Sequence, residues 1–590
     1  MKDKYKILLI FPPPASPVSP YLSTPLLAGQ LKAAGYDVKS LDLSVEFFYY
    51  ILNSEFLKNS YKNAKEKFFC LKNAAEKLSL KDSTFCKIVE KNLEEEQKNL
   101  EIIDNIDNYL KKYKSYDSFY DIETMDYITQ QINRAFEIAM LPYFPAYCAF
   151  NVYKNPLYKV NFGSIKYQTT IKTDDNVFYE FYKKKIKEHN IDKYDFVCIT
   201  CPNETQIIPA LTLTAILKKT SNIKISIGGN IISRIDEELK NMPEAFDIFY
   251  DYVMAGLGEK TIVQLADYLS GKNDNLSNIK GLIYKKNGKI ISKKPDLKYN
   301  INNAAQMCLD GLSLEKYFTP DIIMPIQSSK GCYWGKCLFC GLHYPPKKYT
   351  VKNPKKVVDE IEFLNKEYNI KIFEFVDEAL HPAYLSKLAD EIIRRKLDIK
   401  YVCCARLEDN LYSEELCSKL YKSGLRLVEF GFETASERIY KLLNKGIKFE
   451  NRLNAISLFA KAGIFTYVYA IIGYPSETRD EAITTLSCAK KHEDIIDTLF
   501  IHNFWLDKKA PAFKKYKCLG ISEININEKD CFSQGCDFMC DNGMKKEEID
   551  ELADLNLEDS KLKKHIFFAP DEYFFLYALY YGRQKLRTVL

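Results

Sequence analysis

Three cysteines lie within nine residues of one another, and their type and spacing suggest metal chemistry. They are Cys332, Cys337 and Cys340, in the stretch Gly331–Gly341, which reads GCYWGKCLFCG. The glycines predict a loop rather than a helix or a strand. Thiolates are ligands for soft metals, and three are one fewer than the four that usually hold an iron–sulfur cubane. An iron with an open position could bind a substrate or a cofactor.

Two other interpretations of these cysteines stay open at this point. They could be ordinary buried thiols, although so tight a cluster argues against that. His343 follows Cys340 by three positions, so a structural zinc site with three cysteines and one histidine is the stronger alternative. The chain would then be a zinc-stabilised binding module, and the purified protein would be colourless rather than brown.

Length and composition limit the class of protein. The chain has 590 residues, of which 46% are hydrophobic, and a net charge of +5. This is enough for roughly two to four domains, and so weak and dispersed a charge gives no reason to expect nucleic acid as a partner. The apolar run at the N-terminus is too short for a signal peptide or a membrane span. Because the 17 cysteines have no export signal, we expect a reducing, cytoplasmic location and no membrane association.

The first 290 residues alternate strand and helix, which predicts a doubly wound, Rossmann-like α/β domain. The alternation is interrupted by a mostly helical insertion at about 44–175, within which Ala146–Lys172 is ambiguous. A hairpin is predicted at Ile279–Ile291, turning at Asn287-Gly288. In such a sheet ligands bind at the carboxyl ends of the parallel strands. The strands are predicted at Lys6–Ile10, Val38–Leu43, Phe196–Thr200, Lys224–Gly228 and Asp251–Met254.

Residues 322–506 predict six further strand–helix units, which make a partial (β/α)6 barrel related to the eight-stranded one. We expect 291–321 to be a linker and assign no role to 507–590. In barrels of this kind the chemistry lies at the carboxyl ends of the strands. The cysteine loop follows the first strand, and acidic residues follow later ones at Asp377, Glu378, Glu408 and Glu433.

A second group of cysteines lies near the C-terminus. These thiols could hold a second metal centre, but no recognisable motif surrounds them, so unligated thiols or a modest structural role are favoured. The group consists of Cys518, Cys531, Cys536 and Cys540.

Several motifs together resemble the radical S-adenosylmethionine (SAM) superfamily, and within it the class with an N-terminal cobalamin-binding domain. In the C-terminal half they are the cysteine loop, FEFVDEAL at 373–380, GFETASERIYKLLNKG at 431–446 and IIGYPSET at 471–478. In the N-terminal half, STPLLAGQL, GGN and AGLGE resemble the cobalamin domain. Two features depart from the family pattern. The cysteine spacing is four residues then two, rather than three then two, and the Asp-x-His-x-x-Gly motif that supplies a lower cobalt ligand is absent.

The resemblance implies cofactors and site residues. It implies a [4Fe–4S] cluster on Cys332, Cys337 and Cys340, together with SAM and cobalamin. By the same resemblance, the residues expected at SAM are Phe339, Asp377, Glu378, Glu433 and Gly473. Those expected at cobalamin are Thr24, Thr200, Cys201, Gly228, Gly229, Gly256, Gly258 and Glu259. Because the first loop, Pro12–Pro20, contains no histidine, we expect no histidine from that loop on the cobalt.

The resemblance also implies an activity, which is reductive cleavage of SAM to a 5′-deoxyadenosyl radical. With cobalamin present, methyl transfer to an unactivated carbon or phosphorus is the expected outcome, with two SAM molecules used per turnover. A non-methylating radical enzyme that modifies a peptide or natural product, with a vestigial N-terminal domain, is the alternative. The expected partners are a small-molecule or peptide substrate and an electron donor such as flavodoxin or ferredoxin. The sequence does not identify the substrate.

Overall fold

The structure is a computed structural model, and it describes residues 5–74, 78–297, 299–342, 348–408, 410–525, 532–555, 562 and 571–589. The chain divides into two compact units, each of which is treated by itself. Unit 1 comprises Met1–Asp296, Ala305–Pro320 and Glu528–Phe532. Unit 2 comprises Leu297–Ala304, Asp321–Asn527 and Ser533–Leu590.

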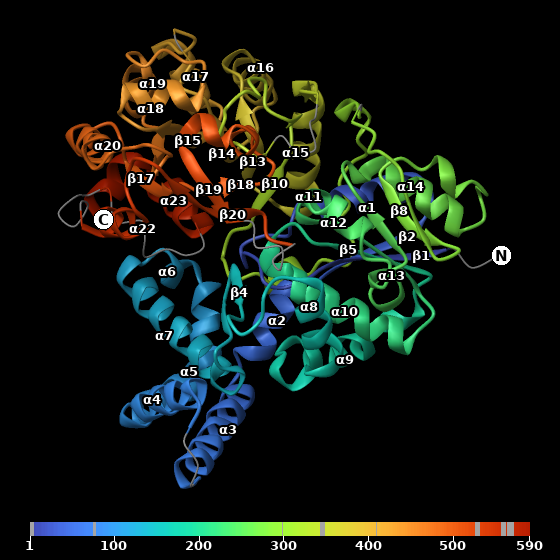
Figure 1. Ribbon diagram of the computed structural model, residues 1–590. Helices are drawn as coiled ribbons and strands as arrows, with labels where there is room; N and C mark the ends of the chain where they lie inside the picture. Colours follow the sequence, from blue (N-terminus) through green and yellow to red (C-terminus); the bar gives the residue numbers. More distant parts are fainter. Residues whose placement is uncertain are drawn as a thin grey trace. The chain divides into compact units, whose positions relative to one another are not determined.

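Unit 1 is built on a seven-stranded sheet with the order β2-β1-β5-β6-β7-β8-β9 (Figure 1). Its first five strands run parallel, which confirms the predicted doubly wound α/β fold, and the predicted hairpin adds β8 and β9 antiparallel to the same sheet. The strands are β1 (Lys6–Phe11), β2 (Asp37–Asp42), β5 (Phe196–Thr200), β6 (Lys224–Gly228), β7 (Tyr252–Met254), β8 (Leu282–Lys286) and β9 (Lys289–Ser292).

Helices cover the sheet and explain its apolar strands. α1 (Ser23–Ala33) and α14 (Gly258–Leu269) pack with β1 and β5 in one buried cluster that includes Leu9, Leu31 and Leu265. α10 (Ile207–Thr220) is buried around most of its circumference, which explains a sequence that is apolar without a polar face. The short helices α11 (Asn230–Arg234), α12 (Asp236–Lys240) and α13 (Ala245–Ile248) complete this part of the unit.

The predicted insertion is mostly helical, as expected, and the ambiguous stretch within it is mixed. Residues 146–172 form a short hairpin followed by helical turns, the last of which is a π-helix, η2 (Tyr167–Ile171). Aromatic rings such as Phe48, Phe136 and Phe150 pack edge to face. The elements are α2 (Leu43–Ile51), α3 (Ser54–Asn73), α4 (Leu80–Glu94), α5 (Glu96–Tyr113), α6 (Tyr116–Phe119), α7 (Ile122–Met140), β3 (Tyr147–Ala149), β4 (Val152–Lys154), α8 (Phe162–Lys166) and α9 (Phe178–Glu188).

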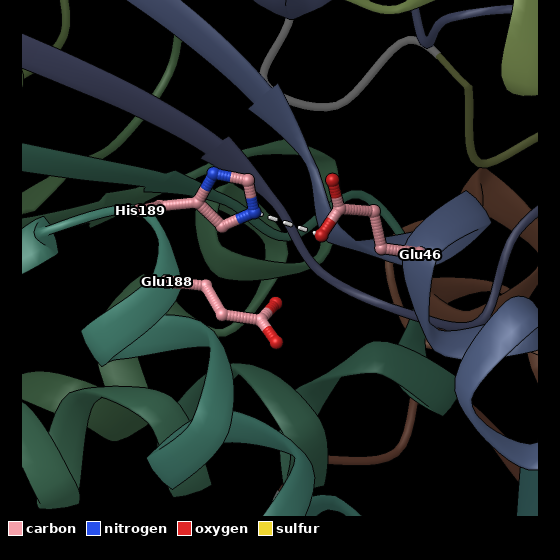
Figure 2. Close-up of side chains that lie close together, drawn as sticks. All are labelled: Glu46, Glu188 and His189. Atoms are coloured by element: carbon pink, nitrogen blue, oxygen red, sulfur yellow. Dashed lines mark hydrogen bonds and ion pairs between the residues drawn. The ribbon is translucent and has the colours of Figure 1, made fainter.

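A buried carboxylate fastens α2 to neighbouring segments of unit 1. Figure 2 shows Glu46 with Glu188 and His189, whose side chains offer possible metal-ligand atoms within 4.8 Å of one another. Glu46 accepts hydrogen bonds from His189 Nε2 at 2.8 Å and pairs with Lys185 and Lys316 at 2.9 Å each. Burial alone would raise its pKa, but these three donors lower it to about 2. With two lysines already in place, the cluster is an internal ion network rather than a cation site.

Unit 1 also includes a segment that sequence analysis assigned to a linker. This return segment, Ala305–Pro320, packs against α1, β2 and the loop after β1. A Cβ added to Gly29 in α1 would lie 2.1 Å from the Gln306 carbonyl oxygen, so the two backbones are in close contact. Tyr317 donates a 2.7 Å hydrogen bond to the buried carboxyl of Asp42. Three backbone hydrogen bonds join the return segment to the rest of unit 1. They run from Ser40 N to Asp310 O, from Cys308 N to Pro25 O and from Phe318 N to Pro17 O, at 2.8, 3.0 and 2.8 Å.

Unit 2 is built on six parallel strands in chain order, as the sequence predicts (Figure 1). β10 and β17 are the edge strands, and each strand is connected to the next by helix. The strands are β10 (Ile323–Ile326), β13 (Ile372–Leu380), β14 (Lys400–Ala405), β15 (Leu425–Glu433), β16 (Phe465–Ile472) and β17 (Thr498–Asn503). The helices are α15 (Pro354–Tyr368), α16 (Pro382–Arg395), α17 (Glu414–Lys422), α18 (Glu437–Leu443), α19 (Arg452–Lys461) and α20 (Arg479–Lys491).

The C-terminal region, for which the sequence suggested no role, completes unit 2. α23 (Asp571–Val589) buries Tyr573 through Leu579 and contacts β14, β15 and β16. Its Arg583 and Arg587 both pair with the buried carboxylate of Asp497. The other elements are β11 (Ser329–Lys330), β12 (Thr350–Val351), β18 (Leu506–Asp507), β19 (Ile521–Asn525), β20 (Gly535–Cys540), α21 (Pro511–Lys514) and α22 (Lys546–Leu555).

Two members of the second cysteine group are held apart from one another. Cys536 and Cys540 lie on the same extended strand, β20. Their Cα atoms are therefore about 13 Å apart, at roughly 3.3 Å per residue. Two thiols so far apart cannot ligate one four-iron cluster. The 16 cysteines within the described ranges are all free, whereas Cys531 lies outside those ranges. Among the helices in the described ranges, none combines the length and apolar character needed to cross a bilayer.

Candidate active site

The cysteine loop follows β10 and β11 at the carboxyl end of the first strand of unit 2. Cys337 is buried, and Cys332 and Cys340 are half-buried. The three thiols interact electrostatically with one another. Burial raises the pKa of Cys340 to about 12. Burial also raises the pKa of Cys337, which the nearby cations of Lys445 and Arg406 partly offset. Thiols gathered in this way suit a cationic centre that would stabilise their thiolates.

Backbone hydrogen bonds fix the loop from outside. The Leu338 N–H donates to the Leu443 carbonyl, at the end of α18, at 3.0 Å. The Leu338 carbonyl in turn accepts from the Ala512 N–H of α21 at 2.8 Å. Positive φ angles of 75° at Gly331 and 64° at Gly335 explain two of the glycines in the loop.

Two of the carboxylates predicted to position SAM lie beside this loop. Glu378 in β13 interacts electrostatically with Cys340, and Glu433 in β15 interacts with Cys337. The structure thus brings the thiols and both carboxylates together in unit 2. Phe339 is half-buried and immediately precedes Cys340.

Glu433 is held in an unusual conformation by a buried ion pair. Its φ is +68°, and the register of β15 with β16 shifts at this position. Its carboxylate pairs with Lys445, whose side chain is 7% exposed against 8% for Glu433. Lys445 also donates to the Gly431 carbonyl at 2.9 Å. Backbone strain of this kind is often concentrated at functional sites. Lys445 was not predicted from the sequence, although it lies within the motif at 431–446.

Asp377 has a different environment from its neighbour Glu378. It is buried, and its carboxylate accepts hydrogen bonds from Ser328 N and from both the Ser328 and Ser329 hydroxyls. These contacts connect β13 to the segment just before the cysteine loop. The carboxylate is therefore engaged in positioning that segment.

The turn after β16 contains Gly473, the last residue predicted at SAM. Gly473 has a φ of +80°, and a Cβ there would lie 2.4 Å from the Ile549 side chain. Its N–H donates to the buried Glu477 carboxylate at 2.6 Å. Burial raises the pKa of Glu477 to about 7. Ser476, with a φ of +68°, gives this turn a second strained residue, so the tight conformation is fixed by side chains as well as by glycine.

In unit 1 the predicted cobalamin residues gather at the carboxyl edge of the sheet, but several of them are engaged with protein. Cys201, which is fully buried, donates its N–H to the Gly228 carbonyl at 2.7 Å. A Cβ on Gly229 would lie 2.3 Å from the Cys201 carbonyl oxygen. This glycine is therefore required for close packing of the loops after β5 and β6.

The remaining predicted residues show the same convergence. Thr24 is buried and donates its hydroxyl to the Tyr21 carbonyl at 3.0 Å. Gly256 donates its N–H to the Ser233 hydroxyl at 2.9 Å, and a Cβ on Gly258 would touch Leu27 of α1 at 3.5 Å. Thr200, at the end of β5, and Glu259, in the first turn of α14, are both buried.

Unsatisfied polar atoms at this edge provide the test of whether a ligand fits. In the described part of the chain, the Ser16, Ser23 and Thr205 hydroxyls and Gln206 Oε1 are buried without a hydrogen-bond partner. Buried polar atoms in proteins are nearly always paired. Ser16 lies on the loop after β1 and Ser23 begins α1, whereas Thr205 and Gln206 follow β5. Gln206 joins the two segments by donating a 2.6 Å hydrogen bond to the Pro12 carbonyl. The edge therefore has polar groups suited to the amides and phosphate of a nucleotide-like cofactor.

The comparisons with known proteins agree with this two-part arrangement. Residues 326–489 match the model of the Radical SAM superfamily. Residues 326–489 thus form a radical SAM domain, and a domain of this class implies a [4Fe–4S] cluster and SAM. This favours an iron–sulfur centre over the zinc alternative, whose fourth ligand, His343, lies outside the described residues.

Two curated proteins are similar to parts of this chain. The chain is 30% identical over 304 residues to an uncharacterized methyltransferase, PH0819, of Pyrococcus horikoshii, covering 50% of this chain and 64% of the relative. It is 32% identical over 164 residues to an anaerobic magnesium-protoporphyrin IX monomethyl ester cyclase of Rubrivivax gelatinosus, covering 28% of this chain and 29% of the relative. The matches thus span less than two thirds of either relative's length.

Two solved structures share the fold. The radical SAM methyltransferase TsrM of Kitasatospora setae, solved with cobalamin and a [4Fe–4S] cluster, is similar with a TM-score of 0.52 and 15% identity. That match covers 88% of this chain and 76% of TsrM. The cobalamin-dependent SAM radical enzyme OxsB is similar with a TM-score of 0.51 and 16% identity, covering 61% of this chain and 58% of OxsB.

Proposed function

We propose that this chain is a cobalamin-dependent radical SAM methyltransferase that acts on an unactivated carbon or phosphorus centre. The observation that carries the proposal is the set of unsatisfied polar atoms at the carboxyl edge of unit 1, in a chain whose unit 2 contains a radical SAM domain. When bound, the cluster would supply the electron for reductive cleavage of SAM, and cobalamin would carry the methyl group. The methyltransferase relative and the cobalamin-bound TsrM support the same assignment.

In unit 2 the chain's own residues would hold and orient SAM. Cys332, Cys337 and Cys340 would hold the cluster. Glu378 and Glu433 are placed to accept hydrogen bonds from the ammonium or ribose hydroxyls of SAM, since both lie beside these thiols. Because Lys445 already pairs with Glu433, Glu433 would have to share its carboxylate between the lysine and SAM.

In unit 1 the loops would bind cobalamin through polar contacts rather than through a histidine. Ser16 and Ser23, between β1 and the start of α1, and Thr205, after β5, offer hydroxyl groups. The first loop, Pro12–Pro20, contains no histidine, cysteine or methionine. We therefore propose that no histidine of this chain serves as the lower ligand of the cobalt. Direct measurement by electron paramagnetic resonance of the Co(II) form would refute this if it showed nitrogen hyperfine splitting.

A second candidate function is ring formation without methyl transfer. The observation that favours it is the similarity to anaerobic magnesium-protoporphyrin IX monomethyl ester cyclases from three organisms, at 24–32% identity. The two candidates differ in products. A cyclase would convert SAM to 5′-deoxyadenosine and methionine, whereas a methyltransferase would also form S-adenosylhomocysteine.

The test is product analysis with the full-length chain, purified anaerobically and supplied with iron, sulfide and hydroxocobalamin. With reductant and SAM, a methyltransferase should form S-adenosylhomocysteine only when cobalamin is present, together with 5′-deoxyadenosine. Formation of 5′-deoxyadenosine alone, with no cobalamin retained after gel filtration, would favour the non-methylating alternative. A colourless protein that cleaves no SAM would reject both.

Further proposals concern partners and location. We propose a small-molecule or peptide substrate and a low-potential electron donor of the flavodoxin or ferredoxin type, because the cluster must be reduced in every cycle. A cytoplasmic, reducing location suits an oxygen-sensitive cluster and the free cysteines of the described ranges.

A further inference from the structure

The segment between the first two cluster cysteines contains four residues, Tyr333, Trp334, Gly335 and Lys336. It is one residue longer than the spacing of the family that the sequence resembles. With glycine at 335 and a second one just before Cys332, the segment has many accessible conformations. Something outside it must select the one that directs Cys337 toward Cys332 and Cys340.

Trp334 provides the first external contact. Its indole Nε1–H donates a 2.8 Å hydrogen bond to the Asn444 carbonyl. Its ring lies over Gly446, where an added Cβ would come within 2.1 Å of the ring atoms. Gly446 has a φ of +69°, so both its backbone conformation and its contact with the indole require glycine. The ring therefore occupies a slot formed by the Asn444–Gly446 turn.

Arg406, immediately after β14, provides the second contact. It is 7% exposed, and its guanidinium lies 5.3 Å from the Trp334 ring centroid and 5.6 Å from that of Tyr333. Arg406 Nε pairs with Glu408 at 2.7 Å, and Tyr333 donates its hydroxyl to the same carboxylate at 2.9 Å. A further guanidinium N–H donates to the Lys445 carbonyl. One cation thus connects β14, the cysteine loop and the Asn444–Gly446 turn.

We propose that Trp334 and Arg406 are positioning residues that hold the longer cysteine loop in its ligand geometry before the cluster binds. The proposal rests on the three cysteines being the cluster ligands. Each contact removes conformations of the loop that would separate Cys337 from the other two thiols. The loop therefore loses its conformational entropy during folding rather than during cluster binding. Substitution of such supporting residues commonly costs about 10- to 100-fold in metal affinity.

The test compares Trp334→Ala, Trp334→Phe and Gly446→Ala in the full-length chain. Trp334→Phe keeps a ring over Gly446 and Arg406 but loses the indole N–H, and Gly446→Ala keeps the indole but fills its slot. Trp505→Ala removes the chain's other tryptophan, whose ring also lies over a glycine, Gly535. Gly463→Ala introduces a side chain at a φ of +83°, where the nearest atom is 3.5 Å away.

Each variant is reconstituted with iron and sulfide, desalted, and exposed to a chelator. Trp334→Ala and Gly446→Ala should lose iron about 10-fold faster than the unaltered chain, and the electron paramagnetic resonance of the reduced cluster should broaden. Trp334→Phe should lie between them and the unaltered chain, while Trp505→Ala and Gly463→Ala should match the unaltered chain. Equal iron retention and spectra in Trp334→Ala, Gly446→Ala and the two controls would overturn the proposal.

A measurement on the iron-free protein covers the case in which an alanine variant folds poorly. In a Trp505→Phe background Trp334 is the only tryptophan, so its fluorescence reports its own contacts. We expect it to be shielded from an added quencher before iron is supplied, and to become more accessible in Gly446→Ala. An indole that is accessible without iron and shielded only after reconstitution would also overturn the proposal. Failure of the unaltered chain to bind iron would instead reject the cluster assignment itself.

Discussion

Replacing Lys445 with methionine should destabilise unit 2 strongly, because it leaves the Glu433 carboxylate buried without its cation. The two side chains are 7% and 8% exposed. Removing one partner of a buried ion pair typically costs about 3–5 kcal/mol. For a unit of this size each kcal/mol lowers the melting temperature by about 2–4 °C, so the expected loss is roughly 6–20 °C.

A second buried ion pair in the same unit provides a control that distinguishes an effect on stability from an effect on SAM binding. Lys352 and Glu360 are 7% and 5% exposed and lie 2.7 Å apart, so Lys352→Met should cause a thermal loss of similar size. Glu433 and Lys445 lie beside the cysteine loop, whereas Lys352, the residue after β12, pairs with Glu360 of α15. Only Lys445→Met should therefore also weaken SAM binding.

The double variant Glu433→Gln/Lys445→Met provides the decisive comparison. It removes both charges, so most of the lost stability should return, because neither buried charge is left unpaired. SAM binding should stay weak, since the carboxylate is absent. The assays are anaerobic thermal melting and equilibrium SAM binding to the cluster-loaded chain. If Lys445→Met melted within about 2 °C of the unaltered chain, less than about 1 kcal/mol would be lost, and the description of Glu433 and Lys445 as a buried pair would be wrong. Losses that simply add in the double variant would refute the coupling.

Three further predictions concern the cluster cysteines of unit 2 and two buried carboxyl groups of unit 1. Alanine at Cys332, Cys337 or Cys340 should abolish the cluster absorbance and SAM cleavage; full iron loading would contradict this. Burial raises the pKa of Asp42 to about 6, so its folded form binds a proton more tightly than its unfolded form. Asp42→Asn should therefore gain stability relative to the unaltered chain as pH rises from about 4 to about 6, measured by melting across that range. Glu46→Gln should be less stable at neutral pH, and the difference should shrink as pH falls from about 4.5 toward 2, because the pKa of Glu46 is lowered to about 2; a pH-independent difference would contradict this.

The sequence predicted the strands well because both sheets are mostly parallel and buried. Segments such as KILLI and FVCIT are short apolar runs flanked by polar or glycine-containing loops, and both are strands in the structure. The predicted hairpin was also recognisable from its Asn287-Gly288 turn, where φ is 51° and 76°. Its addition to the main sheet was not predictable, since strand pairing between distant segments has no local signal.

The candidate site was predicted less completely, for a similar reason. Cysteine spacing identifies a ligand loop locally, and the position of Glu378 and Glu433 after strands is visible in the sequence. Arg406 and Lys445 are single basic residues, and nothing near them in the sequence distinguishes a buried, multiply bonded cation from a solvated one. Gly446 has a partial signal in the motif at 431–446, but its contact with Trp334 joins residues more than a hundred positions apart.

The return segment has a consequence for how this protein can be cut. After Asp296 the chain enters unit 2, returns to unit 1 at Ala305–Pro320, and then enters unit 2 again. No single peptide-bond cleavage can therefore release either unit whole. A truncation after residue 290 would remove the backbone partners of Ser40, Pro25 and Pro17 and expose the buried surface of α1. A protease that nicks the chain between residues 297 and 304 should leave two fragments that remain associated until a denaturant separates them.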